Sequence, residues 1–299
     1  MKQKTLGRGY KFWGKGLHTG CYSHMRIKPA PANTGIVFVR TDLGVEIPAT
    51  AANVSSTARS TTLSVGKVSV GTVEHVLSAL TGLGIDNAYI EIDNREVPIL
   101  DGSAKPYIDA ICVDKLIEQD AERQYLELEH EIYVENHKTG SYIRITPSEV
   151  PSVDLTIDFN SHVLGVQTVH WDPSVDYSTQ IAPCRTFCFL HEVLTMHALG
   201  LVKGGDVENA IVIVEKPVSD RKIRKIAKMF GQPTISITPE GYLSNLELRF
   251  PDECGRHKLL DIMGDFRLVG GFFKAHVEAY KPGHALNTQA ALEFSKSLK

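Results

Sequence analysis

Apolar and polar residues roughly alternate in several short runs of the first half of the chain, which is typical of half-buried strands. Between residues 23 and 70 these runs are MRIKP, GIVFVRTD, VEIPATAANV, TTLSV and KVSV. The period becomes helical in GTVEHVLSALTGLG, which predicts a helix that ends at a glycine. A strand over residues 87–93 and a helix over residues 105–119 are expected to follow.

The second half of the chain repeats this order of elements. Strands are expected over residues 125–134, 141–146, 153–159 and 166–170, then a helix over 256–265, a strand over 273–280 and a helix from about Ala285. His75 and His257 each begin a His-x6-Gly segment in the corresponding helices. This correspondence favours an internal duplication of an α+β unit, with chance similarity as the alternative.

The repeat predicts an α+β fold of two similar domains, each a mostly antiparallel sheet packed with helices. The charged stretch 120–124 is the expected boundary, so the domains would cover residues 1–122 and 123–299, with the active site between them. In the second domain, residues 186–215 show a strand, a helix, a glycine-rich turn and a strand. This order predicts an inserted βαβ unit.

Composition narrows the class of protein. A net charge of -3 gives no reason to expect a nucleic-acid partner. No run of 18 apolar residues is present, and the polar N-terminus lacks the apolar core of a secretory signal. Five cysteines without a CxxC pair fit free thiols in a reducing compartment. We therefore expect a cytoplasmic protein, and we expect it to be a monomer.

Two short motifs could together bind a metal ion. Glu74 and His75 are adjacent in one predicted helix, and His257 and Asp261 lie four residues apart in another. Either pair alone is also compatible with an ordinary helix surface. If the duplicated halves pack about a pseudo-twofold axis, the two histidines and Asp261 converge. Three such ligands with one open position suit a catalytic zinc ion, and Glu74 could then take a proton from water.

Other polar residues are weaker candidates. His284, in YKPGHALN at an expected loop–helix junction, could act as an acid or stabilise developing charge. Thr186 could donate to an oxyanion or could be an ordinary strand residue, and Phe187 is by default a core residue. Lys258 adds a positive charge beside the His257–Asp261 pair. The glycines around His18 in GKGLHTG indicate a tight turn rather than a metal ligand.

Taken together, these segments resemble the UDP-3-O-acyl-N-acetylglucosamine deacetylase family. The resemblance runs in order from residue 14 to residue 287. It is carried by GKGLHTG, TVEHVLSALTGLGIDNAYIEID, PILDGSAKPY, IDF, RTFCFL, GLVKGGDVENAIVI, RHKLLDIMGD and YKPGHALN. It implies hydrolysis of the N-acetyl group of UDP-3-O-(3-hydroxyacyl)-N-acetylglucosamine, with release of acetate and the free amine, in lipid A biosynthesis.

The resemblance also implies roles for individual residues. The zinc ligands would be His75, His257 and Asp261, although Fe²⁺ suits the same ligands. Glu74 would be the general base and His284 the general acid or charge-stabilising group. The remaining residues carried over from the family are Thr186 for the oxyanion, Asp265 for orienting His284, Phe159, Phe187, Glu192, Lys258 and Lys281 for the UDP-sugar, and Val193, Leu201, Val202, Val207 and Val212 in the acyl passage.

One departure from the family and two other functions stay open. Some relatives have a nucleotide-contacting lysine at the position aligned with Ser141, whereas here Lys138 is nearby but out of register. A zinc amidase for another N-acetyl sugar is one alternative function. A non-catalytic module that binds zinc or a nucleotide sugar is the other, although a structural zinc site needs no general base.

Overall fold

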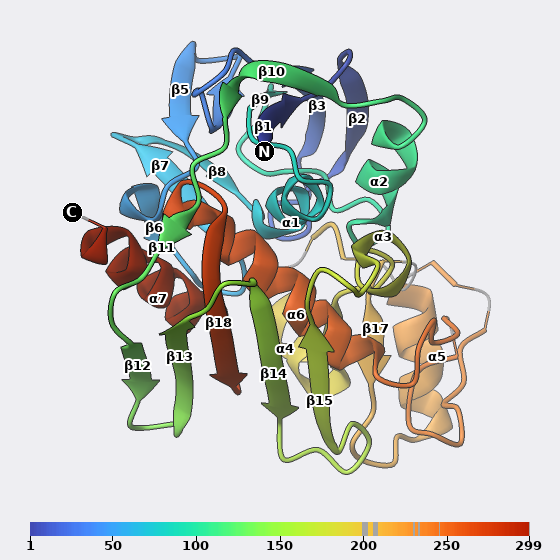
Figure 1. Ribbon diagram of the computed structural model, residues 1–299. Helices are drawn as coiled ribbons and strands as arrows, with labels where there is room; N and C mark the ends of the chain where they lie inside the picture. The colour runs from blue at the N-terminus through green and yellow to red at the C-terminus, as the bar shows by residue number, and fades with distance from the viewer. Residues whose placement is uncertain (199–202, 206–208, 230, 233, 245, 299) are drawn as a thin grey trace.

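The computed structural model describes residues 1–198, 203–205, 209–229, 231–232, 234–244 and 246–298 (Figure 1). Its strands form several mostly antiparallel sheets, as expected for an α+β fold. The two largest sheets lie on either side of a pair of buried helices, and the site described below is built around those helices.

The first large sheet has five strands in the order β2-β3-β9-β4-β5. These strands are β2 (Tyr10–Lys15), β3 (Tyr22–Pro29), β4 (Ile36–Arg40), β5 (Val45–Pro48) and β9 (Ala88–Ile92). The last strand in sequence, β9, is central: it pairs antiparallel with β3 and parallel with β4. Every second residue of β9 is buried, which is the period of a strand with one face in the core.

The second large sheet has the order β12-β13-β18-β14-β15. Its strands are β12 (Ile132–Asn136), β13 (Ser141–Pro147), β14 (Ser152–Asp158), β15 (Val166–Trp171) and β18 (Phe273–Tyr280). Strand β18 is central, antiparallel to β13 and parallel to β14. Both sheets therefore share one strand order and one set of pairing directions, which is what the proposed duplication predicts.

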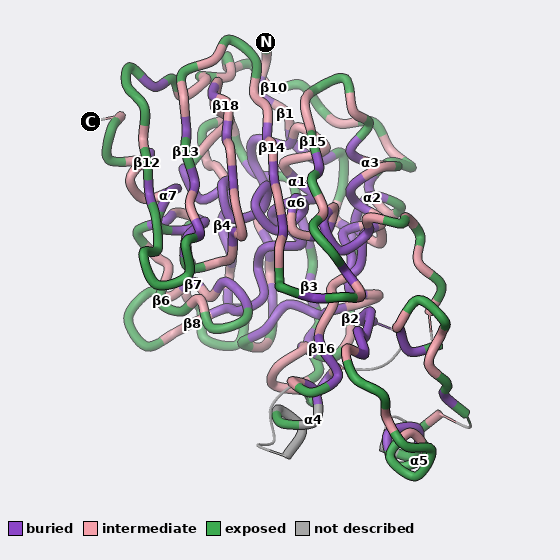
Figure 2. The backbone as a smooth tube through the Cα atoms, turned by 90° about the horizontal axis from the view of Figure 1, so that it is seen from below, coloured by how far each residue is buried: buried purple, intermediate pink, exposed green. Residues whose placement is uncertain are grey.

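Two helices occupy equivalent positions before the central strands. Helix α1 (Glu74–Gly82) precedes β9, and α6 (Glu253–Phe266) precedes β18. They pack against each other, and both lie in the buried middle of the molecule (Figure 2). At Gly264 a side-chain Cβ would overlap the backbone carbonyl of Glu74. The missing side chain thus allows α6 to approach the first turn of α1 closely.

Helices and short strands complete these units. Helix α2 (Lys105–Ile111) follows β9 and α7 (His284–Ser297) follows β18. The shorter elements are β6 (Val54–Ser56), β7 (Thr62–Val65) and β8 (Val68–Gly71) in a three-stranded sheet, the 3-10 helices η1 (Ala51–Asn53) and η2 (Arg267–Val269), and β11 (Leu126–Glu127) beside β18.

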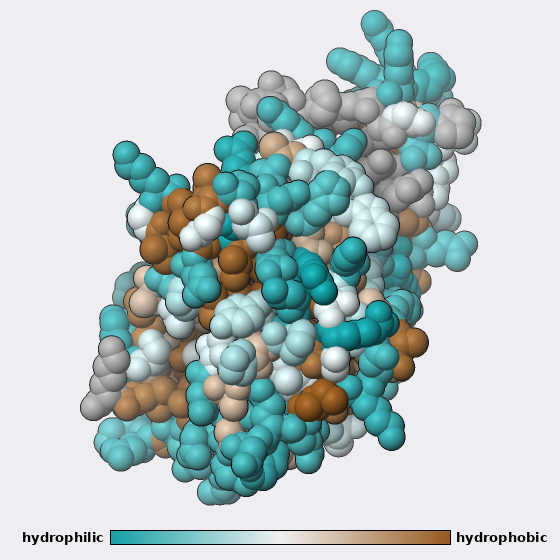
Figure 3. Space-filling view, turned by 90° about the horizontal axis from the view of Figure 1, so that it is seen from above, coloured by the Kyte–Doolittle hydropathy of each residue, from teal (hydrophilic) through white to brown (hydrophobic). Residues whose placement is uncertain are grey.

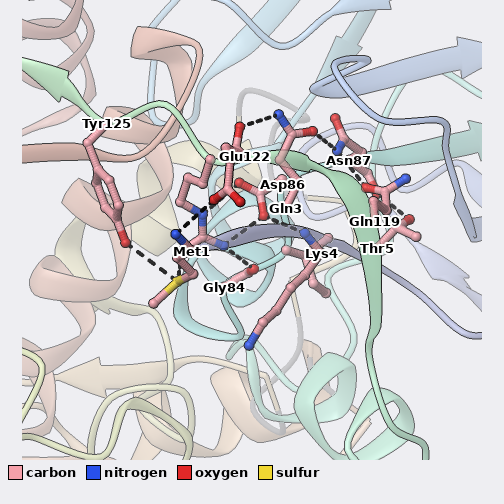
Figure 4. Close-up of polar contacts among 12 residues, drawn as sticks. Met1, Gln3, Lys4, Thr5, Gly84, Asp86, Asn87, Gln119, Glu122 and Tyr125 are labelled. Carbon is pink, nitrogen blue, oxygen red and sulfur yellow. Dashed lines mark hydrogen bonds and ion pairs between the residues drawn. The ribbon is translucent and has the colours of Figure 1, made fainter.

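The helix expected over residues 105–119 is wrong in its second half. Helix α2 ends at Ile111, and β10 (Ile117–Glu122) instead pairs antiparallel with β1 (Lys2–Thr5). An exposed ion pair accompanies this pairing, because Glu122 accepts from the terminal ammonium of Met1 at 3.0 Å (Figure 4). The expected boundary stretch 120–124 therefore begins inside a strand. The strand expected over 125–134 is likewise two short strands, β11 and β12.

Residues 186–215 contain parallel strands joined through a helix. Strand β16 (Phe187–Phe189) pairs in parallel with β17 (Ile211–Ile213), and α4 (Leu190–Ala198) lies between them in sequence. Two further helices, α3 (Tyr177–Gln180) and α5 (Asp220–Met229), were not predicted. Helix α5 projects from the rest of the chain (Figure 2).

The molecular surface is predominantly polar on the face shown in Figure 3, with smaller hydrophobic areas between hydrophilic side chains. Within the described part of the chain, no helix combines the length and the apolar character that crossing a lipid bilayer requires.

We expect Gly264→Ala to destabilise the protein by about 1–3 kcal/mol, because the added methyl group forces α6 away from Glu74. Urea unfolding of the two proteins measures the difference. Gly271→Ala is the matched control: its Cβ would lie 3.5 Å from Leu126, an ordinary contact, so a change within about 0.5 kcal/mol is expected. Equal stabilities for wild type and Gly264→Ala would contradict the close helix crossing.

Candidate active site

Three buried side chains from the two packed helices meet at one point. His75 lies in the first turn of α1, and His257 and Asp261 lie one turn apart on α6. Oδ1 of Asp261 is 3.6 Å from Nε2 of His75 and 3.4 Å from Nε2 of His257. One ligand-type atom from each residue lies within 4.8 Å of the others. Separations of this size suit three atoms that bind one small cation.

The hydrogen bonds of these residues fit a metal ion. Nδ1 of His257 lies 3.0 Å from the backbone carbonyl of Cys184, so an Nδ1–H can donate there and leave Nε2 free as a ligand. Oδ2 of Asp261 accepts from Lys258 at 2.7 Å. Oδ1 of Asp261 is buried and has no hydrogen-bond partner among the described residues. A bound cation would satisfy this buried oxygen.

Their protonation states are also those of metal ligands. Burial lowers the pKa of His257 to about 3, so its imidazole is neutral near pH 7. Burial acts to raise the pKa of Asp261, but the charge of Lys258 and the adjacent His257 outweigh it and hold that pKa well below its usual range. A neutral imidazole and an ionised carboxylate are the forms that Zn²⁺ or Fe²⁺ would bind.

Glu74 lies beside the ligand group as the first residue of α1. Its Oε2 accepts from the backbone N–H of Thr61 at 3.0 Å, and its Oε1 faces Nε2 of His284 at 3.8 Å. Burial raises the pKa of Glu74, although the neighbouring His284 and His75 act in the opposite direction. A buried carboxylate with a raised pKa is suited to accept a proton near neutral pH.

His284 begins α7 and carries a positive charge at neutral pH. Its Nδ1 lies 2.9 Å from Oδ2 of Asp265, which also accepts from Asn287 at 2.8 Å. Burial acts to lower the pKa of His284, but the carboxylates of Asp265 and Glu74 outweigh it and raise the pKa to about 9. The imidazolium thus presents an Nε2–H toward Glu74 and Asp261, at 3.8 and 3.9 Å.

An aromatic path connects the surface with the ligand group. Phe159 follows β14 and is 42% exposed. Its ring centroid is 5.5 Å from that of Phe187, whose centroid is 6.3 Å from that of His257. Nζ of Lys258 lies 5.7 Å from the centroid of Phe187. Three of the predicted substrate residues are therefore contiguous. Phe187 is partly buried and also packs against the main hydrophobic core.

Lys281 lies in an open cavity next to His284. The cavity has a volume of about 790 Å³, and Lys138 and Ser141 also line it. Nζ of Lys281 is paired with Asp158 at 2.9 Å. Lys138 does not align with the lysine of the relatives, whose position Ser141 occupies. Both residues nevertheless line the same cavity, so either position can contact a ligand there.

The other predicted site residues are less closely connected. The backbone N–H of Thr186 donates to Gly102, and within the described part of the chain no hydrogen bond joins its hydroxyl to the ligand group. Glu192 is partly exposed and Val193 is buried on α4, and Val212 is buried in β17 within a small apolar cluster. Leu201, Val202 and Val207 lie outside the described residues.

Two residues near the site carry little or no signal in the sequence. Thr61 donates to both Glu74 and Asp265, yet nothing in its local sequence marks it. His18 forms the expected turn, in which its backbone N–H donates to Glu96 at 2.8 Å. Burial lowers the pKa of His18, Glu96 acts in the opposite direction, and the positive charge of His284 is close enough to lower it further, so this histidine lies near the site. The flanking glycines were the only signal for it.

Comparison with known proteins gives one family and many relatives. A family model described as LpxC, UDP-3-O-acyl N-acetylglycosamine deacetylase, matches residues 3–230 and 231–296. The bifunctional enzyme LpxC/FabZ of Chlorobaculum tepidum is 41% identical over 100% of this chain, which spans only 64% of that relative's length. The UDP-3-O-acyl-N-acetylglucosamine deacetylases of Saccharophagus degradans and Nostoc sp. are 40% and 37% identical, with 91% and 97% of their lengths covered.

We expect His257→Ala and Asp261→Ala each to weaken metal binding more than about 100-fold, because each removes a direct ligand. Loss of a residue that only orients a ligand typically costs roughly 10–100-fold. Elemental analysis after dialysis measures the bound metal. Glu74→Gln should retain the metal, and His24→Ala, which changes an exposed histidine, is the control. Full occupancy in the His257 variant would exclude this ligand set.

The charge of His284 makes stability depend on pH in the metal-free protein. Its folded-state pKa of about 9 lies above the ordinary value near 6.5, so its stabilisation is complete below about pH 6.5 and is lost as pH rises through 9. The free energy of unfolding of wild type minus that of His284→Gln should be up to about 3 kcal/mol larger at pH 6 than at pH 10. Urea unfolding with chelator measures this, with His24→Gln as control. The same difference at both pH values would exclude a charged His284.

Proposed function

Since this chain belongs to the LpxC family of UDP-3-O-acyl N-acetylglycosamine deacetylases, we propose that it hydrolyses the N-acetyl group of UDP-3-O-(3-hydroxyacyl)-N-acetylglucosamine. The products would be acetate and the free amine, in lipid A biosynthesis. The observation that carries the proposal is the group of His75, His257 and Asp261 with Glu74 and His284 beside it. The names of the relatives support the same reaction.

We propose one Zn²⁺ per chain, held by His75, His257 and Asp261. When bound, this ion would polarise the acetamide carbonyl and lower the pKa of a water molecule. The protein's part is to keep the imidazole of His257 neutral and the carboxylate of Asp261 ionised, which burial and Lys258 achieve. The donation from His257 to the carbonyl of Cys184 would fix the ring orientation.

The proton transfers would use Glu74 and His284. Glu74 takes a proton from the attacking water as a bond forms between the water oxygen and the carbonyl carbon. His284, oriented by Asp265, places a positive charge near the oxyanion, and Thr186 would contribute a hydroxyl. The C–N bond then breaks as protonated Glu74 or His284 delivers a proton to the leaving amine.

The substrate would extend from the metal ligands in two directions. Phe159, Phe187, Lys258, Lys281 and Glu192 would contact the UDP-sugar. The cavity next to His284 suits a diphosphate because cationic residues line it, namely Arg59, Lys138 and Lys281. The acyl chain would follow the β16–α4–β17 unit, which contains Val193 and Val212. The family resemblance assigns Leu201, Val202 and Val207, which lie outside the described residues, to the same passage.

We further propose that the chain has two domains, residues 1–122 and 123–299, with the active site at their interface and an insert at about 186–215. The shared strand order of the two large sheets supports this division. The first unit would supply Glu74 and His75, and the second would supply the remaining ligands and His284.

The decisive assay is acetate release from the acylated UDP-sugar, with and without chelator. We expect activity that chelation abolishes, with kcat/KM falling about 10²–10⁴-fold in Glu74→Gln and in His284→Ala. His170→Gln, on the exposed side of β15, is the control. Equal activity on UDP-N-acetylglucosamine without an acyl chain would favour a different amidase. Substrate binding without turnover would favour a binding module.

Acyl-chain length should control turnover. Burial of each methylene is worth roughly 0.8 kcal/mol, so about ten could contribute up to ~8 kcal/mol before ordering costs. A shortened substrate should therefore lose kcat as well as raise KM. Val193→Trp should block a long-chain substrate but spare a short one, with Val166→Trp at an exposed position as control. If both substrates slow equally in Val193→Trp, Val193 does not line the acyl passage.

A further inference from the structure

A second cavity lies on the other side of α6 from the metal-ligand group. Its volume is about 170 Å³. Helix α6 lines it with Ile262, Met263 and Phe266, residues that alternate with the active-site carboxylates along the helix. The opposite wall comes from the second large sheet through Val153, Trp171 and Val277, with Phe272 and Phe273 beside them. The proposed deacetylation uses none of these residues.

Two buried guanidinium groups line this cavity but share one carboxylate. Arg123 forms a two-pronged contact with Asp86, through Nε at 2.8 Å and Nη2 at 2.7 Å. Within the described part of the chain, Arg267 donates only to backbone carbonyls, those of Ile85 at 3.1 Å and Asp86 at 2.9 Å. Nη1 of Arg267 is buried without a hydrogen-bond partner among the described residues. Together, Arg123, Arg267 and Asp86 carry a net charge of +1.

This charge persists at neutral pH. Burial lowers the pKa of Arg267 to about 10, and the charge of Arg123 acts in the same direction, yet the guanidinium stays protonated. Both groups lie over the ring of Phe272, with guanidinium carbons 3.9 and 4.5 Å from its centroid. The ring quadrupole stabilises a cation only in part, so an anion at this end of the cavity would be favoured.

We propose that this cavity binds a compact monocarboxylate with an apolar, ring-sized body. A planar carboxylate matches the guanidinium of Arg267 and neutralises the excess charge. The apolar walls match the rest of such a ligand. An engineered cavity of about 150 Å³ accepts benzene, so 170 Å³ is sufficient for one aromatic ring. Tyr125 and Pro151, both partly exposed, mark a route of entry.

Benzoate is the probe, and Trp171 is the reporter. The chain has two tryptophans, so Trp13→Phe leaves only Trp171, which lines the cavity. We expect benzoate to change Trp171 fluorescence saturably, and benzamide, its neutral analogue, to bind at least about tenfold more weakly because it lacks the charge-assisted contact. Absence of a saturable change, or equal affinity for the two compounds, would overturn the proposal.

Variants in the Trp13→Phe background locate the site. Val153→Met fills the cavity and should lower benzoate affinity at least about tenfold, whereas Val169→Met, the same change on the neighbouring strand away from the cavity, should not. Arg267→Met should remove the preference for benzoate over benzamide. His257→Ala should leave benzoate affinity unchanged. If His257→Ala abolishes binding, or if both methionine substitutions weaken it equally, the carboxylate does not bind in this cavity.

Discussion

The close crossing of α1 and α6 is the contact on which the rest of the site depends. Gly264 allows the backbone of α6 to reach the carbonyl of Glu74, so the first turn of α1 lies against the middle of α6. His75 thereby comes within 3.6 Å of Asp261. A glycine inside a helix costs about 1 kcal/mol relative to alanine. That cost is tolerated here because no residue with a side chain permits the same approach.

Burial alone does not set the chemistry of the site; the arrangement of neighbouring charges does. His257 and His284 are both buried, yet the pKa of one falls to about 3 and that of the other rises to about 9. His257 has one carboxylate beside it, Asp261 at 3.4 Å, and burial together with the charge of Lys258 outweighs it. His284 instead faces the carboxylates of Asp265, Glu74 and Asp261, which outweigh burial. One imidazole is thus prepared to bind a cation and the other to carry a proton.

Two sheets of the same topology produce a site without symmetry. Equivalent helices bring equivalent histidines together, since His75 and His257 have ring centroids only 5.1 Å apart. The carboxylate ligand comes from α6, and α7 adds His284. The corresponding glycines have also diverged in their contacts: Gly82 packs against the ring of Tyr177, and Gly264 packs against Glu74. Of these two glycines, therefore, only Gly264 brings its helix against the backbone of the other helix.

The sequence by itself determined the elements in which apolar and polar residues repeat with a clear local period. Strand β18 covers the residues expected for it, and His257 and Asp261 share a helix face because four residues complete about one turn. The tertiary structure decided what depends on distant partners. The segment 117–122 is a strand because it pairs with β1, which is more than 110 residues away in the sequence. Thr61 and the carbonyl of Cys184 likewise reach the site only through the packing of distant segments. A local pattern specifies which face of an element is buried, but only the packing of the whole chain specifies which residue lies opposite that face.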